Sequence, residues 1–385
     1  MDFKLTDEQE LLLESLREVI ARSASEDYIR ECEEKHEPPT KTYEAFREAG
    51  FNLLGAPEEY GGTPCDIVTQ MIFNIELNRL TSAGYVLGCA TIQLDDMLSF
   101  GSADQLAKTV ESIERGGNPF CMGFTEPDAG SDNNNIQATF ERRNGKVYLN
   151  GYKAFITGAN TAEHCIFMAK DPNQPDPKKQ FSTWWVDMKK PGIKIEPIKK
   201  IGWFMIPTFN VSFDDVEVEE SDIVGIEGRG FINVMKNFEV ERLQLAANAA
   251  GQAWLAFDDA LEYAKQRVQF GKTIGSFQLI QQKLTEMAIR VQNCKSMVLQ
   301  AAWKKDQGMS INTDAALAKY YCSQAAWQNV DDAVQIFGGL GYCEEVRIAR
   351  MLRNCRVGRI GGGTEQIMIH IAGRALQRDA KCLEW

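Results

Sequence analysis

The stretch Phe124-Thr125-Glu126-Pro127-Asp128-Ala129-Gly130-Ser131-Asp132 lies where the hydrophobic pattern of this 385-residue chain changes. Upstream, over residues 6–117, apolar side chains recur every three to four positions, which is typical of amphipathic helices. From about residue 120 to residue 225, apolar and polar residues alternate, as they do in half-buried strands. Asn144-Gly145 separates two of these runs and is typical of a type I′ hairpin turn. The stretch therefore marks the passage from a helical region to a β-sheet.

The helical period returns after Gly228-Arg229-Gly230 and persists through most of the remaining chain. These changes of period predict an α+β multidomain protein, and the length suits two or three domains. We expect an all-α N-terminal domain over residues 1–117 and a small, barrel-like β-domain over residues 118–226. Residues 227–385 are expected to form a C-terminal four-helix bundle.

The overall composition excludes several classes of function. A formal net charge of -12 argues against a surface for nucleic acid or an anionic membrane, because both require a positive field. No apolar run approaches the ~20 residues that a membrane span needs, and the first residues lack a targeting pattern. The ten cysteines include no CxxC pair, and with three histidines they form no zinc-ligand pattern. We therefore expect a cytoplasmic protein without a metal, whose thiols are inert core residues in a reducing compartment.

The stretch 124–132 also has the composition of a ligand-binding loop. Its small residues, its proline and its two hydroxyl groups allow a flat ring and a phosphate to approach the backbone closely. The alternative is a tight loop in which Ser131 and Asp132 cap their own turns.

Three further elements extend this pattern. Tyr152–Gly158 places Phe155 and Thr157 on one face of a strand. Gln266–Lys272 ends a helix at a glycine and supplies Arg267, which suits a pyrophosphate. Gln335–Gly341 is glycine-rich. The alternatives are that Phe155 is a core residue, that Arg267 is a solvated surface charge and that the glycines only end a helix.

Taken in this order, the four elements resemble the acyl-CoA dehydrogenase family over essentially the whole chain. The resemblance implies a homotetramer with FAD held between the β-domain and the bundle. It implies that the flavin and its adjoining phosphate are contacted by Phe124, Thr125, Ser131, Phe155, Thr157, Thr364 and Gln366. It implies that the adenylate half of a neighbouring subunit's FAD is bound by Arg267, Gln278, Gln335 and Gly339. The residues expected to contact the acyl-CoA substrate are Ser131, Glu239 and Arg242.

The expected acid/base residue departs from the usual family pattern. Near the C-terminus, where the family usually has Tyr-Glu-Gly-Thr, this chain has Gly361-Gly362-Gly363-Thr364. The resemblance implies that Glu241, in the run Asn237–Leu243, replaces the missing carboxylate. It also implies that the backbone N–H of Gly362 still polarises the substrate's thioester carbonyl. The alternative is that Glu241 merely pairs with a basic side chain on the helix face.

The resemblance implies an oxidoreductase that interconverts a 2,3-enoyl-CoA and its saturated acyl-CoA. Four segments are similar to the branch of the family that acts in carnitine metabolism. They are Met1-Asp2-Phe3, residues 142–146, residues 267–271 and Gly362-Gly363. That branch reduces crotonobetainyl-CoA to γ-butyrobetainyl-CoA with electrons from an electron-transferring flavoprotein. Three alternatives stay open: an enzyme for another short, branched or aromatic acyl group, a non-redox lyase such as a desulfinase, and a non-catalytic CoA-ester-binding protein.

Two positions depart from the family in ways that bear on the substrate. Phe204, in Gly202–Pro207, stands where the family often has an arginine. It indicates a bulky or aromatic acyl group, altered CoA contacts or core packing at a domain junction. Glu239 stands where the family usually has an aspartate, which is one methylene shorter.

Overall fold

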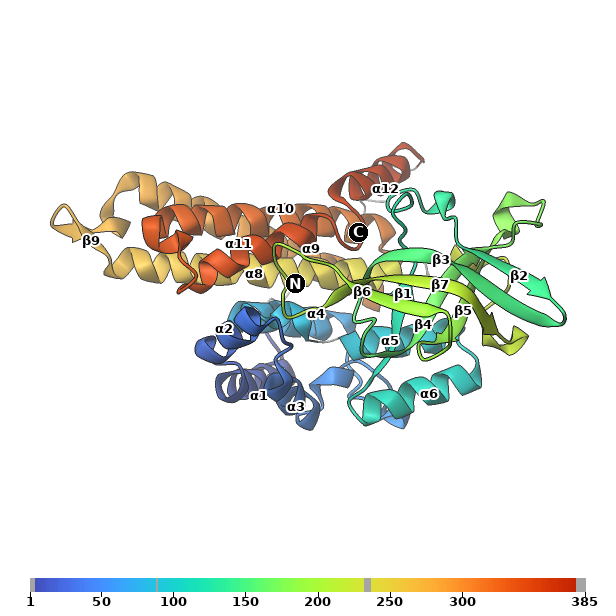
Figure 1. The fold of residues 1–385 in the computed structure, drawn as a ribbon. Helices are drawn as coiled ribbons and strands as arrows, with labels where there is room; N and C mark the ends of the chain where they lie inside the picture. The colour runs from blue at the N-terminus through green and yellow to red at the C-terminus, as the bar shows by residue number, and fades with distance from the viewer. Residues whose placement is uncertain (1–3, 88, 232–236, 379–385) are drawn as a thin grey trace.

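The computed structural model describes residues 4–87, 89–231 and 237–378, and it places helical parts before and after a central β-sheet (Figure 1). The N-terminal helices are α1 Asp7–Ser23, α2 Glu26–Lys35, α3 Thr40–Glu48, α4 Ile67–Leu80, α5 Cys89–Phe100 and α6 Ala103–Glu114. Helix α1 begins with a reciprocal capping box. The hydroxyl of Thr6 accepts a hydrogen bond from the Gln9 amide at 3.2 Å, and the Gln9 side chain accepts one from the Thr6 amide at 3.1 Å.

The strands of the central part form one sheet. Their bounds are β1 Asn118–Gly123, β2 Thr139–Arg143, β3 Lys146–Thr157, β4 Ala162–Lys170, β5 Phe181–Asp187, β6 Ile193–Pro197, β7 Thr208–Val218 and β8 Ile223–Val224. The order is β6-β7-β3-β2-β4-β5-β8, and β1 pairs in parallel with β4. Strands β2 and β3 form the predicted hairpin. Asn144 and Gly145 at its turn have φ values of 51° and 76°, and a type I′ turn requires φ to be positive at both positions.

The sheet encloses its own hydrophobic core. Strands β1 to β5 and β7 all contribute buried side chains to a single cluster, which includes Phe140, Leu149, Phe167, Trp184 and Val211. A sheet whose strands surround one core in this way is barrel-like, so the prediction of a small barrel-like β-domain is confirmed.

The C-terminal part contains α8 Phe238–Gln266, α9 Gln278–Asp306, α10 Asn312–Phe337, α11 Arg347–Cys355 and α12 Glu365–Arg378. The hairpin of β9 Val268–Gln269 and β10 Lys272–Thr273 projects from the end of this part that lies farthest from the sheet (Figure 1). The long helices α8, α9 and α10 pack on one another, and the shorter α11 packs on α10 and α8. These four helices form the predicted bundle, and α12 lies against α10.

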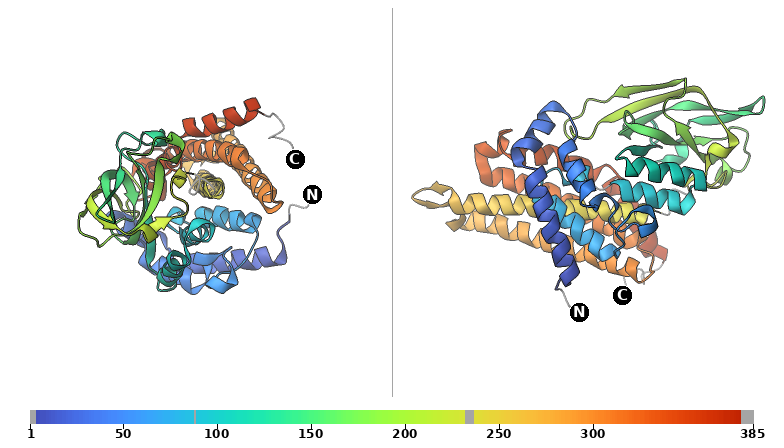
Figure 2. Two further views of the ribbon diagram at one scale, coloured as in Figure 1. Left: turned by 90° about the vertical axis from the view of Figure 1, so that its right-hand side faces the viewer. Right: turned by 90° about the horizontal axis from the view of Figure 1, so that it is seen from below.

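Helix α8 also joins the bundle to the N-terminal helices. Figure 2 (left) shows α8 end-on in the middle of the molecule, with the N-terminal helices, the β-sheet and the remaining C-terminal helices around it. Its contact with α4 is close, because a Cβ atom placed on Gly251 would lie 2.3 Å from the carbonyl oxygen of Ile75. Asn78 on α4 also donates a hydrogen bond to Asn248 on α8 at 3.0 Å. Only glycine fits at this crossing.

Three general properties follow from the described residues. No helix in the ranges 4–87, 89–231 and 237–378 is long and apolar enough to cross a membrane. Within the same ranges, no group of three or more His, Cys, Asp or Glu side chains is arranged to hold a metal ion. Eight of the ten cysteines have described side chains, and all eight are free thiols. Six of these are buried, as expected for small apolar core residues.

The close crossing of α4 and α8 predicts that a methyl group added at Gly251 destabilises the protein. We expect Gly251→Ala to lower the free energy of unfolding by about 1–3 kcal/mol, because the new Cβ overlaps the backbone of α4. The matched control is Gly373→Ala in α12, where nothing lies within 4 Å of the new atom. There the loss of a helix glycine should stabilise the protein by up to about 1 kcal/mol. Urea unfolding followed by circular dichroism measures both changes, and equal effects of the two substitutions would contradict the interpretation of the crossing.

Candidate active site

The loop 124–132 follows β1, and backbone hydrogen bonds within the loop and to β3 fix its conformation. Glu126 and Ala129 exchange two backbone hydrogen bonds of 3.1 Å, and the amide of Ala154 in β3 donates to the carbonyl of Thr125 at 2.8 Å. The Asp132 carboxylate accepts a hydrogen bond from the Asn134 amide at 3.2 Å, as in the predicted alternative of a self-capped turn. Phe124 and Thr125 are half-buried, whereas Ser131 is exposed.

A buried ion pair fixes this loop against the sheet. The Lys153 ammonium lies 2.8 Å from a Glu126 carboxylate oxygen and donates to the carbonyl of Met168 at 2.6 Å. The same carboxylate accepts hydrogen bonds from the backbone amides of Gln137 and Ala138 at 2.6 and 2.9 Å. Lys153 is fully buried, and burial lowers its pKa although the charge of Glu126 opposes this shift. Such a pair is stable only when its remaining hydrogen bonds are satisfied, as they are here.

The end of β3 presents an exposed aromatic side chain beside the loop. Phe155 is 65% exposed and has a φ of 60°, at a register shift between β3 and β7 that lies between Lys153 and Ile156. A left-handed backbone is rare for a bulky residue and is often found at functional positions. Ile156 is buried and Thr157 is exposed, so Phe155 and Thr157 both face away from the core. Phe155 is therefore not a core residue.

Glu241 lies in the first turn of α8, close to the sheet. Phe238, three residues earlier, packs against the same core cluster as Phe124. Glu241 is half-buried, and its carboxylate forms no hydrogen bond or ion pair with another described residue. Burial raises the pKa of this carboxyl, and the charge of Arg242 only partly opposes the shift. Among the described residues, Glu241 therefore interacts with the charge of Arg242 on its helix but forms no ion pair with it.

The segment Gly361–Thr364 lies over α8 one helical turn from Glu241. A Cβ atom placed on Gly362 would meet Cδ1 of Leu245 at 2.2 Å, and Gly362 has a φ of 63°. Lys319 on α10 is buried and donates a hydrogen bond to the Gly363 carbonyl at 2.5 Å. Burial lowers the pKa of Lys319 to about 8. The segment is therefore held between Lys319 on α10 and Leu245 on α8. Leu245 lies one helical turn after Glu241, so Gly362 packs against the same part of α8 that carries Glu241.

Arg242 and Glu239 belong to the same helical turn but have different surroundings. Arg242 is buried, lies over the ring of Phe238 and donates to the Asn312 side chain at 3.2 Å. Glu239 is turned toward the connection between α9 and α10, where its carboxylate accepts hydrogen bonds from Ser310 at 3.0 Å and from the Ile311 amide at 3.3 Å. Two residues along a helix point to nearly opposite sides, which separates Glu239 from Glu241. A contact between Glu239 and a substrate therefore stays a prediction.

The remaining predicted residues divide into two groups. Thr364 is half-buried, and its hydroxyl caps α12 by accepting a hydrogen bond from Ile367, while Gln366 is exposed nearby. Arg267, Gln278, Gln335 and Gly339 are exposed at the opposite end of the bundle. Helix α8 has 29 residues, so its two ends lie roughly 43 Å apart. Within one chain, the residues expected to bind the adenylate half of FAD therefore lie far from Glu241.

Sequence reasoning missed two carboxyl groups on α5, one of which, Asp96, interacts with Glu241. Asp96 on α5 is 5% exposed and accepts a hydrogen bond from the side chain of Asn237 at 2.8 Å. Burial raises its pKa to about 7, and the charge of Glu241 adds to this shift. Burial likewise raises the pKa of Asp95 to about 6. The available signal was the pair Asp95-Asp96 within an otherwise apolar helical run, because adjacent acidic residues are unusual inside a protein.

Phe204 lies at the junction of the three parts of the chain. Its ring stacks on that of His36 with centroids 4.2 Å apart, and the Arg353 guanidinium lies 5.6 Å from its centroid. This position is that of a packing residue at a domain junction, which is one of the three interpretations that the sequence allowed.

Comparison with known proteins assigns the family. Three models of acyl-CoA dehydrogenase domains match in order: the N-terminal domain over residues 6–117, the middle domain over 121–216 and the C-terminal domain over 228–377. The chain is 51% identical over 380 residues to the probable acyl-CoA dehydrogenase YdiO of Escherichia coli K12, covering 98% of this chain and 99% of that protein.

Solved structures agree with this assignment. Butyryl-CoA dehydrogenase of Megasphaera elsdenii matches with a TM-score of 0.90 and 30% identity over 98% of this chain and 100% of that chain. PigA, solved with FAD and proline, matches with a TM-score of 0.91 and 30% identity over 98% of this chain and 99% of that one. The chain therefore belongs to the acyl-CoA dehydrogenase family, whose members are oxidoreductases that act on CH–CH bonds.

Proposed function

We propose that this protein interconverts a 2,3-enoyl-CoA and the saturated acyl-CoA, and that Glu241 is its acid/base residue. The observation that carries the proposal is the half-buried Glu241 carboxyl, which forms no ion pair with a described residue and lies one helical turn before the contact of Leu245 with Gly362. A general acid or base needs a pKa close to the working pH, and burial raises the pKa of Glu241 in that direction. The desulfinase alternative is less well supported, because a lyase of that kind has no need of this carboxyl.

FAD is the cofactor that the site residues fit. The exposed Phe155, the exposed Thr157 and the loop that holds Thr125 form an open rim at the end of β3. We propose that the flavin is held by Phe124, Thr125, Ser131, Phe155, Thr157, Thr364 and Gln366. Bound FAD supplies the two-electron exchange at the substrate's Cβ.

The adenylate half of the cofactor is proposed to reach a second subunit. Arg267, Gln278, Gln335 and Gly339 lie at the end of α8 that is remote from Glu241. Large apolar side chains are exposed in the same region, among them Phe270 at 93% and Tyr342 at 85%. Exposed apolar groups of this size are common where subunits associate. Both features support the homotetramer that the family resemblance implies.

The two catalytic groups of the chain have different tasks. The backbone N–H of Gly362 stabilises the negative charge that develops on the thioester carbonyl when a proton leaves or reaches Cα. Lys319 and Leu245 restrain the segment that presents this N–H. Glu241 transfers the proton: it donates to Cα when the enoyl-CoA is reduced and accepts from Cα in the opposite direction.

We propose crotonobetainyl-CoA as the substrate and an electron-transferring flavoprotein as the electron donor. The product is then γ-butyrobetainyl-CoA. The acyl group of this substrate ends in a quaternary ammonium, a cation that a nearby negative charge stabilises. Asp96 supplies a carboxyl group that interacts with Glu241, and Asp95 precedes it on α5; neither aspartate forms an ion pair with a described residue. A cation would lower the cost of burying these carboxyls as anions.

The central experiment is anaerobic. The purified flavoprotein is photoreduced, and crotonobetainyl-CoA, crotonyl-CoA and cinnamoyl-CoA are then added separately while the visible flavin band is followed. We expect crotonobetainyl-CoA to restore the band fastest. If crotonyl-CoA or cinnamoyl-CoA reacts faster, the enzyme acts on another acyl group. If no enoyl-CoA restores the band, the proposed redox reaction is wrong.

The role of Glu241 predicts a pH dependence. Reduction needs the protonated carboxyl, so its rate should fall as the pH rises through the raised pKa of Glu241. Oxidation of the acyl-CoA needs the carboxylate, so its rate should rise over the same range. Glu241→Gln should slow both directions by about 10²–10⁴-fold and abolish this pH dependence. The control is Glu262→Gln on the exposed far end of α8. A Glu241→Gln enzyme with the parent's rate and pH profile would exclude the role.

The role of Asp96 is tested by comparing kcat/KM for two substrates, one with and one without the quaternary ammonium. We expect Asp96→Asn to lower kcat/KM for crotonobetainyl-CoA relative to crotonyl-CoA by about 5–10-fold, since a lost charge pair near a protein surface is worth about 1 kcal/mol or more. The ratio cancels any effect on the proton transfer, because both substrates need it. Asp104→Asn, at an exposed position of α6 where it pairs with Lys108, serves as the control. An unchanged ratio would show that Asp96 does not recognise the acyl group.

A further inference from the structure

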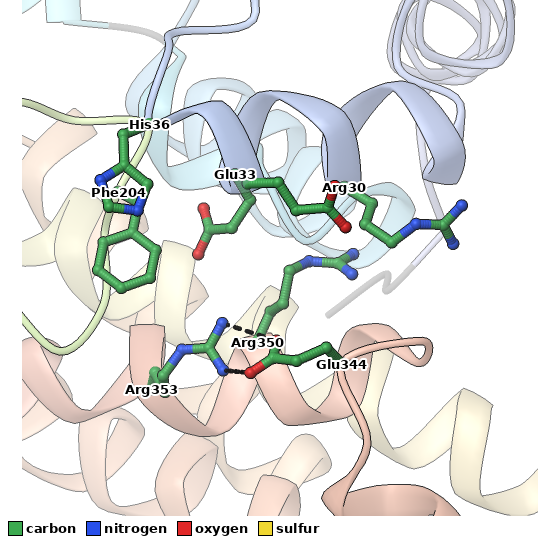
Figure 3. Close-up of a pocket in the computed structure, with 8 residues that line it drawn as sticks. Arg30, Glu33, His36, Phe204, Glu344, Arg350 and Arg353 are labelled. Carbon is green, nitrogen blue, oxygen red and sulfur yellow. Dashed lines mark hydrogen bonds and ion pairs between the residues drawn. The ribbon is translucent and has the colours of Figure 1, made fainter.

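A second polar cleft lies apart from the candidate active site and shares none of its residues. Its volume is about 360 Å³, and it opens between α2, the connection 198–207 that carries Phe204, and α11 (Figure 3). Helix α2 contributes Glu33 and ends at His36, while α11 contributes Arg350 and Arg353. The cleft therefore lies where the N-terminal helices, the β-domain and the bundle meet.

One wall of the cleft carries a buried carboxylate with an unused acceptor. Glu33 is 2% exposed, and one of its oxygens accepts a hydrogen bond from the Asn354 side chain at 3.3 Å. The other oxygen, Oε2, is buried and has no hydrogen-bond partner among the described residues. Burial raises the pKa of Glu33 against the opposing effects of Asn354 and the two arginines. A buried acceptor without a partner is costly unless a ligand or water completes it.

The facing wall carries two guanidinium groups with unused donors. Arg350 is 2% exposed; its Nη2 pairs with Glu26, while its buried Nη1 has no partner among the described residues. Arg353 uses Nη1 and Nη2 for Glu344, at 2.5 and 3.0 Å, while its Nε has no such partner. Neither guanidinium forms an ion pair with Glu33, although Figure 3 shows these side chains on facing walls.

The charges of the two walls select the class of ligand. Glu26 and Glu344 already pair with Arg350 and Arg353, and Arg30 and Glu34, which also line the cleft, add one charge of each sign. A simple anion would therefore add net negative charge next to Glu33. A simple cation would leave the guanidinium donors unpaired. A molecule with both charges satisfies all three unused groups and adds no net charge.

We propose that this cleft binds a small zwitterion of the amino-acid type. The three unused atoms are buried, so the side chains must rotate for its carboxylate to pair with Nη1 of Arg350 and Nε of Arg353 and for its ammonium to pair with Oε2 of Glu33. The stacked rings of His36 and Phe204 form an apolar wall for the methylene groups between the two charges. Phe204 stands where the family often has arginine, and a third guanidinium there would compete with the ligand for Glu33.

The test uses the full-length, flavin-loaded protein and isothermal titration calorimetry at constant ionic strength. The probes are glycine, β-alanine and 4-aminobutyrate, with sodium acetate and methylammonium chloride as ligands that carry one charge each. We expect at least one amino acid to bind saturably at concentrations up to about 10 mM, a Kd range that weak polar contacts reach, and neither single-charge ligand to do so. If no amino acid binds, or if acetate or methylammonium binds equally well, the proposal is wrong and water completes the three groups.

Two variants link the binding to this cleft. Glu33→Gln should weaken the amino acid that binds by about tenfold or more, because a neutral amide replaces the carboxylate at the ammonium. Glu31→Gln, at an exposed position of the same helix where Glu31 pairs with Lys35 at 2.5 Å, should leave the affinity unchanged. The flavin spectrum and the melting temperature check the fold of each variant. If Glu33→Gln does not fold, Arg353→Gln gives the same test, and a parent-like affinity in the folded variant overturns the proposal.

Discussion

The close approach of α4 and α8 is the constraint on which the rest of the structure depends. Helix α8 is surrounded by the three parts of the chain, and its middle consists of small buried residues, among them Ala246, Ala247, Ala250 and Gly251. Small side chains permit backbone contact, so the hydrogen bond from Asn78 to Asn248 and the ion pair from Arg79 to Asp258 form across the same crossing. Because the crossing holds α8 in register, it also determines where Glu241 at the beginning of the helix lies relative to the sheet.

The electrostatics of the active site follow from that placement. The beginning of α8 meets α5 on one side and the segment 361–364 on another, so Asp96, Glu241 and Gly362 come from three distant parts of the sequence. Burial raises the pKa of both carboxyls, and the charge of Glu241 makes the ionisation of Asp96 still less favourable. Gly362 leaves the space for Leu245 that a side chain would occupy. The packing of Leu245 therefore leaves no room for a side chain at position 362.

The polar groups at the domain junction have a different origin. Glu33, Arg350 and Arg353 belong to helices from opposite ends of the chain, and each is satisfied only in part by its neighbours. In contrast, the buried pair Glu126 and Lys153 is completed by four backbone groups: Glu126 accepts hydrogen bonds from two amides, and Lys153 donates to two carbonyls. The difference separates a pair that stabilises the fold from a cleft with unused hydrogen-bonding capacity. A buried polar network whose hydrogen bonds are all made rigidifies the protein, whereas each buried group without a partner carries a desolvation cost.

The sequence by itself determined the features that depend on neighbouring residues. The capping box at Thr6, the hairpin turn at Asn144-Gly145, the order of helices and strands and the family motifs all follow from local backbone preferences and side-chain period. The tertiary structure alone decided that Glu239 turns toward Ser310, that Asp96 lies beside Glu241 and that Arg267 lies at the far end of α8 from it. It also decided that Glu33 faces two arginines more than 300 residues away. The physical reason is that these relations depend on how helices cross and on which charges become buried, and neither is encoded in any single stretch of the chain.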